Sequence, residues 1–98
     1  MKYFLCKFIP PRADFLATMS PTESDLMKRH GVFMNDLLDK RLVVAHGPVD
    51  DPAGGWGLSL YAVEDDHDMR ATTSQDPMVI NGGGRYEIYP MRHLRSRG

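Results

Sequence analysis

Apolar residues at the start of the chain alternate with a two-residue period. This period in segment 2–9 predicts a β-strand. One face carries Phe4, Cys6 and Phe8, and the other carries Tyr3, Leu5 and Ile9. Because both faces are mainly apolar, we expect both sides of the sheet to be covered. Pro10-Pro11 ends the strand.

A helical period follows the connection 12–19, whose own structure the sequence leaves open. Residues 20–23 read Ser-Pro-Thr-Glu, a capping box with proline at the first helical position. Gly31 weakens this helix by roughly 1 kcal/mol relative to alanine. Lys40 and Arg41 are expected in its last turn, where cations suit the helix dipole. Apolar residues recur at helical spacing at Leu26, Met27, Phe33, Met34, Leu37 and Leu38.

Three further segments predict strands. The apolar run 42–45 indicates a buried strand that Gly47-Pro48 ends, and a turn follows at 50–55. Segment 85–89 predicts the last strand, which Pro90 stops. Segment 56–63 predicts a strand with one apolar face made of Trp56, Leu58, Leu60 and Ala62.

A second, weaker helix is expected between the last two strands. Asp65 or Asp66 would cap it, and it would run towards Gln75 with Met69 and Ala71 facing inward. Asp76-Pro77 would end it, because the residue before proline disfavours helical geometry. A loop through three glycines is then expected over 78–84.

The order strand, helix, strand, strand, helix, strand predicts an α+β, ferredoxin-like βαββαβ domain over 1–90. Its four-stranded antiparallel sheet would carry both helices on one face. The other face would be wet in a monomer, so we expect two sheets to pair in an isologous homodimer. Residues 91–98 form a basic tail, either a solvated terminus or an anion-gripping segment that closes over the partner.

Composition narrows the classes of function. The 98 residues carry 12 Lys and Arg against 13 Asp and Glu, for a net charge of −1. This balance disfavours a nucleic-acid partner. The single cysteine excludes an intramolecular disulfide and a multi-cysteine metal site. With no signal peptide and no membrane segment, the chain is expected to be cytoplasmic.

His30 and Asp76 are the candidate catalytic residues. His30 falls on the apolar stripe of the first helix, four residues after Leu26. It is either a core histidine with satisfied ring nitrogens or a general acid or base at the mouth of a cleft. Asp76 either caps and ends a helix or orients a histidine and stabilises its imidazolium.

Other polar motifs favour structural roles. The acidic clusters (Asp50, Asp51, Asp65, Asp66, His67 and Asp68) coincide with turns and helix starts, and they lack metal-ligand spacing. The run Gly82-Gly83-Gly84 lacks the lysine that follows a phosphate loop. Cys6 alternates with two phenylalanines, which indicates a core position. No metal or cofactor is therefore expected.

The ordered motifs over roughly 2–90 resemble those of the YCII-related family. These motifs are His30 with apolar residues four and seven positions later, Gly47-Pro48 after a strand, the acidic glycine turn 50–55, Asp76-Pro77 and Tyr89-Pro90. The resemblance implies a domain of the dimeric α+β barrel type with a cleft that holds a His30–Asp76 pair. The chain departs from the family pattern at Arg41, where the helix often ends in glycine.

The resemblance also implies a class of activity, the transformation of small cyclic or aromatic metabolites without a cofactor. The first hypothesis is a lyase, isomerase or dehalogenase in which His30 moves a proton and Asp76 orients it. A backbone amide near Gly47 or Gly83 would stabilise an enolate oxygen. The second is a non-catalytic dimer that binds a small ligand or acts as an interaction module. A cofactor-free monooxygenase is a third.

Overall fold

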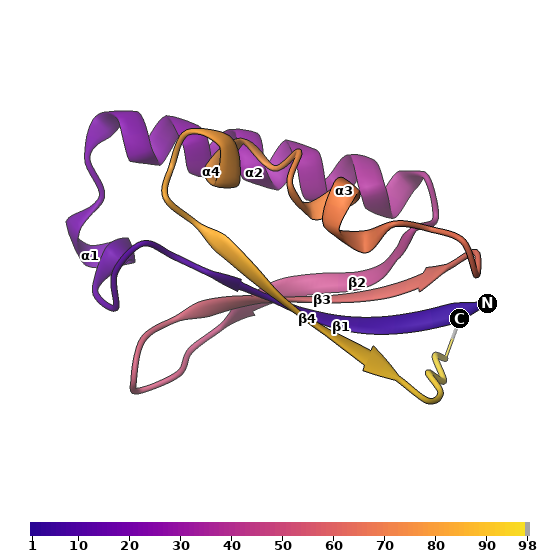
Figure 1. The fold of residues 1–98 in the computed structure, drawn as a ribbon. Helices are drawn as coiled ribbons and strands as arrows, with labels where there is room; N and C mark the ends of the chain where they lie inside the picture. The colour runs from indigo at the N-terminus through magenta and orange to yellow at the C-terminus, as the bar shows by residue number, and fades with distance from the viewer. Residues whose placement is uncertain (98) are drawn as a thin grey trace.

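The fold is built on one antiparallel sheet of four strands in the order β2-β3-β1-β4 (Figure 1). The computed structural model describes residues 1–97. The predicted ferredoxin-like α+β fold is confirmed, and so are the bounds of the first and third strands. The strands are β1 (Lys2–Ile9), β2 (Val43–Val49), β3 (Trp56–Val63) and β4 (Arg85–Met91).

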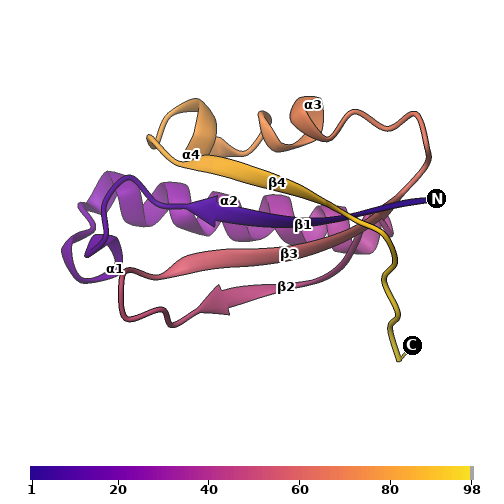
Figure 2. The ribbon, with the colours of Figure 1, turned by 60° about the horizontal axis from the view of Figure 1, so that its bottom comes forward.

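The helices form a layer over one face of this sheet, as predicted, and leave the other face open (Figure 1). The long helix α2 (Pro21–Asp39) spans the sheet, and α3 (Met69–Thr73) and α4 (Pro77–Ile80) lie beside it. A further turn of helix, α1 (Phe15–Thr18), lies in the connection 12–19, whose structure the sequence left open. Figure 2 shows the strands from the side that carries no helix. No helix within residues 1–97 is long and apolar enough to cross a membrane.

Both ends of α2 have local causes. The Ser20 side chain accepts from the Glu23 backbone N–H, and the Glu23 side chain accepts from the Ser20 N–H, which completes the predicted capping box. The helix ends at Asp39, so the prediction that Lys40 and Arg41 lie in its last turn was wrong. Arg41 instead takes a left-handed φ of 65°, and two backbone hydrogen bonds, Arg41 N to Leu38 O and Leu42 N to Leu37 O, close a Schellman motif.

Two strands are longer than predicted. β2 continues through Gly47-Pro48 to Val49, and β4 continues past Pro90 to Met91. Both are edge strands, which have a neighbouring strand on one side only. Proline is tolerated in such a strand at positions where the backbone N–H would point away from the sheet, because no hydrogen bond of the sheet is lost there. Met91 pairs with Tyr3, and therefore the expected tail 91–98 begins one residue later; its last residue, Gly98, lies outside the described residues.

The second crossover differs most from the prediction. Asp68 caps α3 by accepting from the Ala71 N–H, so Asp65 and Asp66 are not the caps. Ala71 is exposed, and Thr73 faces inward instead because its hydroxyl donates to the Met69 carbonyl and is satisfied there. The predicted loop after Asp76 begins with the helical turn α4, which Asp76 caps.

The core lies between the helices and the inward face of the sheet. It has two buried clusters, one around Tyr61 and one around Phe8. On β3 the inward positions are Ser59, Tyr61 and Val63, while Trp56, Leu58, Leu60 and Ala62 alternate with them and face the open side. The open face thus carries a set of apolar side chains that remain partly exposed.

Candidate functional site

Asp76 is the centre of a buried polar network. Its side chain is completely buried and accepts three hydrogen bonds. The Met78 backbone N–H donates to Oδ1 at 2.9 Å, which starts α4. The Tyr86 hydroxyl donates to Oδ2 at 2.5 Å, and His30 Nδ1 lies 2.6 Å from the same oxygen. A buried carboxylate requires such partners, because its desolvation is otherwise costly.

His30 faces Asp76 from α2, and its ring packs against the ring of Phe8 on β1. Its ring centroid lies 4.5 Å from that of Phe8, with the rings tilted by 33°. Because a carboxylate only accepts hydrogen bonds, Nδ1 is the ring nitrogen that donates its N–H to Asp76. The hydrogen bonds among residues 1–97 leave Nε2 without a protein partner, so it is the nitrogen available to a bound molecule.

Tyr86 is the third member of the network, and it was not singled out from the sequence. Burial, together with the charge and hydrogen bond of Asp76, raises the pKa of the Tyr86 phenol far above its ordinary value. The hydroxyl therefore stays protonated at neutral pH and donates to Asp76. The two-residue period of the last strand places Tyr86 inward, and a buried tyrosine hydroxyl needs an acceptor. That period was the available signal.

A cleft of about 280 Å³ lies beside His30, between α2 and the sheet. This volume is near the lower end for small-molecule sites, and the lining is predominantly apolar and aromatic, as such sites usually are. The cleft receives side chains or backbone from α1, α2 and all four strands, with Tyr86 as the contribution of β4. Its apolar lining side chains include Phe8, Phe15, Met27 and Met34, whereas Trp56 and Leu58, whose side chains face the open side, border it as part of β3.

His46 and Ser59 bring polarity to the cleft lining. They are cross-strand partners on β2 and β3, so their side chains share the inward face. His46 Nε2 lies 3.0 Å from Asn35 Oδ1 on α2, which fixes its ring and leaves Nδ1 as the nitrogen not used in this contact. The sequence prediction missed His46 because the predicted strand covered only residues 42–45. Residue 46 lay outside that strand, so its side chain was not assigned to either face of the sheet.

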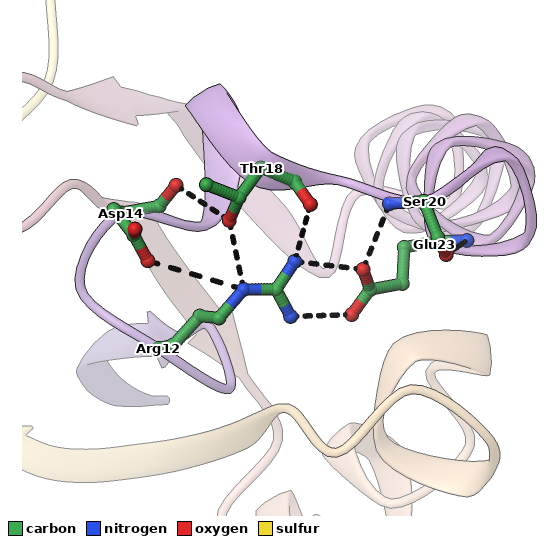
Figure 3. A network of polar contacts seen from close by, with 5 residues as sticks. All are labelled: Arg12, Asp14, Thr18, Ser20 and Glu23. Atoms are coloured by element: carbon green, nitrogen blue, oxygen red, sulfur yellow. Dashed lines mark hydrogen bonds and ion pairs between the residues drawn. The ribbon is translucent and has the colours of Figure 1, made fainter.

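The end of the cleft near α1 is held by an ion pair. Arg12 contacts both carboxylate oxygens of Glu23 at 2.8 Å, and it also donates to the side chain and carbonyl of Thr18 (Figure 3). Arg12 and the Ser20 N–H lower the pKa of Glu23 to about 2. This network joins α1 to the start of α2, and α1 supplies Phe15 to the cleft.

The remaining sequence candidates lie outside this network. Cys6 is buried in the core, and burial raises the pKa of its thiol to about 12. Gly83 has a left-handed φ of 72° in the turn before β4 and does not line the cleft, whereas Gly47 does. A Cβ at Gly84 would lie 2.6 Å from the Phe8 ring, so close packing explains this glycine. No three His, Cys, Asp or Glu side chains within residues 1–97 form a group that could hold a metal.

Comparison with known proteins adds distant structural likenesses and no relative by sequence. No protein-family model and no curated protein matches the chain. Among solved structures, a formyltetrahydrofolate deformylase from Pseudomonas putida KT2440 aligns with 95% of this chain at 16% identity and a TM-score of 0.46. This chain spans 30% of that protein's length.

Proposed function

We propose that this protein is a cofactor-independent acid–base enzyme of the lyase, isomerase or dehalogenase type, acting on a small cyclic or aromatic metabolite. The observation that carries the proposal is the contact between buried Asp76 and His30 Nδ1, which leaves Nε2 available beside the cleft. The resemblance of the sequence motifs to the YCII-related family supports the same reaction class.

The proposed chemistry is proton transfer at a carbon next to a carbonyl or a leaving group. His30 Nε2 accepts the proton, and Asp76 stabilises the imidazolium that forms, because its carboxylate faces Nδ1. Tyr86 and the Met78 N–H hold Asp76 in place. Across the cleft, His46 and the Gly47 backbone are the groups that would contact a developing oxyanion.

Hydrogen–deuterium exchange at acidic C–H bonds tests this proposal without knowledge of the natural substrate. A panel of cyclic ketones and unsaturated lactones is incubated with the protein in D₂O, and ¹H NMR follows the loss of the proton next to the carbonyl. The His30→Gln variant should lower the protein-dependent rate by about 10²–10⁴-fold, the usual contribution of a general base. His93→Gln is the matched control, because His93 is exposed and does not line the cleft.

The outcome also separates the second candidate function. A protein that binds members of the panel, but exchanges no proton faster than buffer does, is a ligand-binding protein without acid–base activity. The predominantly apolar cleft favours a ligand-binding function, because it provides apolar area for binding and few polar groups for catalysis. If His30→Gln and wild type exchange at equal rates, the proton-transfer role of His30 is refuted.

We also propose that the protein is a homodimer built through the open face of the sheet. The supporting observation is that Leu5, Leu58 and Leu60 lie on this face and stay partly exposed. Light scattering should therefore return twice the chain mass of 11.1 kDa. Leu60→Glu should give a folded monomer, whereas Val32→Glu, at an exposed position on α2, should leave the dimer intact. A wild-type mass near that of one chain contradicts the proposal.

A further inference from the structure

A glycine occupies an inward-facing position in the middle of α2. Met27, His30, Gly31 and Met34 all line the cleft. Relative to Met27 they stand three, four and seven residues further on, which is the spacing of one helix face. The other three positions on this face carry side chains that reach the cleft. Position 31 faces the same cleft and carries none.

The absence of a side chain at this position is not explained by packing. A Cβ built on Gly31 meets no atom within 4 Å, so the helix does not need glycine to let another segment approach. Glycine within a helix nevertheless lowers the stability of the folded protein relative to alanine. Gly31 thus costs stability at a site where an alanine methyl would fit the folded protein without a clash.

The empty space lies where a reacting molecule would need it. Gly31 adjoins His30, whose Nε2 is available, and the cleft around it is bounded by the flat rings of Phe8 and His30. Aromatic rings pack against one another in stacked or edge-to-face arrangements, which favours a flat occupant over a bulky aliphatic one. The two methionines beside Gly31 are flexible and adapt to such a ring.

We propose that Gly31 is a specificity-determining residue, which leaves the space beside His30 in which the ring of a flat aromatic or cyclic ligand lies. This inference deepens the proposed function, since it takes the cleft to be the substrate site. The property of the substrate that Gly31 would select is the width of the ring that lies over it. It requires binding and does not require proton transfer.

The test compares two probes of different width, phenol and 2-naphthol, with Gly31→Ala and Gly31→Leu. Binding is followed by NMR of the ¹³C-labelled methyl groups of Met27 and Met34, both of which line the cleft. Gly31→Ala should leave phenol binding unchanged and weaken 2-naphthol binding by about tenfold, the usual cost of one misplaced methyl group in an apolar site. Gly31→Leu should weaken the binding of both probes.

Gly31→Ala should raise the stability of the protein although it weakens the binding of the wider probe. Gly31→Ala is expected to raise the melting temperature by about 4–8 °C, because alanine is a better helix former than glycine. Val32→Ala is the matched control: Val32 is the next residue of α2, is 70% exposed and does not line the cleft. It should also raise the melting temperature, since alanine is the better helix former, while both probes bind as they do to wild type.

The binding and melting data together decide whether Gly31 has this role. The inference is supported if Gly31→Ala binds 2-naphthol more weakly and melts at a higher temperature, while Val32→Ala binds both probes as wild type does. Equal 2-naphthol binding by Gly31→Ala and wild type overturns it, and so does a wild type that binds neither probe. If the dependence on ring width is present but no C–H exchange occurs, the proposed catalysis fails while the role of Gly31 stands.

Discussion

The Asp76→Asn substitution tests the polar network most directly, because it changes one atom and one charge at a fully buried position. Asparagine can still accept from the Met78 N–H through its amide oxygen and so can still cap α4. An NH₂ group then replaces Oδ2, the atom that now accepts from His30 and Tyr86. Because an NH₂ group donates, His30 Nδ1 must become the acceptor, and its proton moves to Nε2.

The expected magnitude follows from the bonds that are lost. Two hydrogen bonds to a charged acceptor disappear, each worth about 1.5–3 kcal/mol, and new bonds from the amide offset part of that loss. We therefore expect Asp76→Asn to lower the free energy of unfolding by about 2–4 kcal/mol. Proton transfer by His30 should fall by as much as about 10⁴-fold, since Nε2 no longer has a lone pair to accept a proton.

Two measurements check this prediction. Urea unfolding gives the loss of stability, and ¹⁵N NMR of the His30 ring shows which nitrogen carries the proton. Asp68→Asn is the control: Asp68 caps α3 with its carboxylate but is exposed, and within residues 1–97 that carboxylate has no hydrogen bond to a histidine, so asparagine should cost only a few tenths of a kcal/mol. If the two variants lose equal stability and the His30 proton stays on Nδ1, the network does not act as described.

Three further predictions concern other parts of the chain. The Glu23 pKa, lowered from 4.5 to about 2, makes its contribution to stability present above pH 4.5 and lost as pH falls towards 2; Glu23→Gln should remove that part of the acid dependence in urea titrations. Arg41→Gly should keep or raise the urea midpoint, because it relieves about 1 kcal/mol of left-handed strain, whereas Arg41→Val should lower it. A thiol reagent should modify native Cys6 far more slowly than urea-unfolded Cys6, since burial holds its pKa near 12; equal rates would contradict this.

Elements with strong local signals could be predicted from the sequence alone. The strand Lys2–Ile9 shows a two-residue period, and α2 begins at a capping box whose four residues are neighbours in the chain. Such signals are read correctly because the interactions that produce them lie within a few residues. The order of the elements was then enough to predict the ferredoxin-like topology, since few right-handed arrangements are compatible with it.

Only the tertiary structure decided how far the edge strands run and what joins the candidate site. Pro48 and Pro90 stop a strand only where their missing N–H is needed, and that depends on which strands lie at the edges of the sheet. His30 and Asp76 are 46 residues apart, and the crossover through α3 and α4 brings them to 2.6 Å. Tyr86 and the cleft beside Gly31 arise from the same packing of α2 on the sheet, which is a contact between distant segments that no local period encodes.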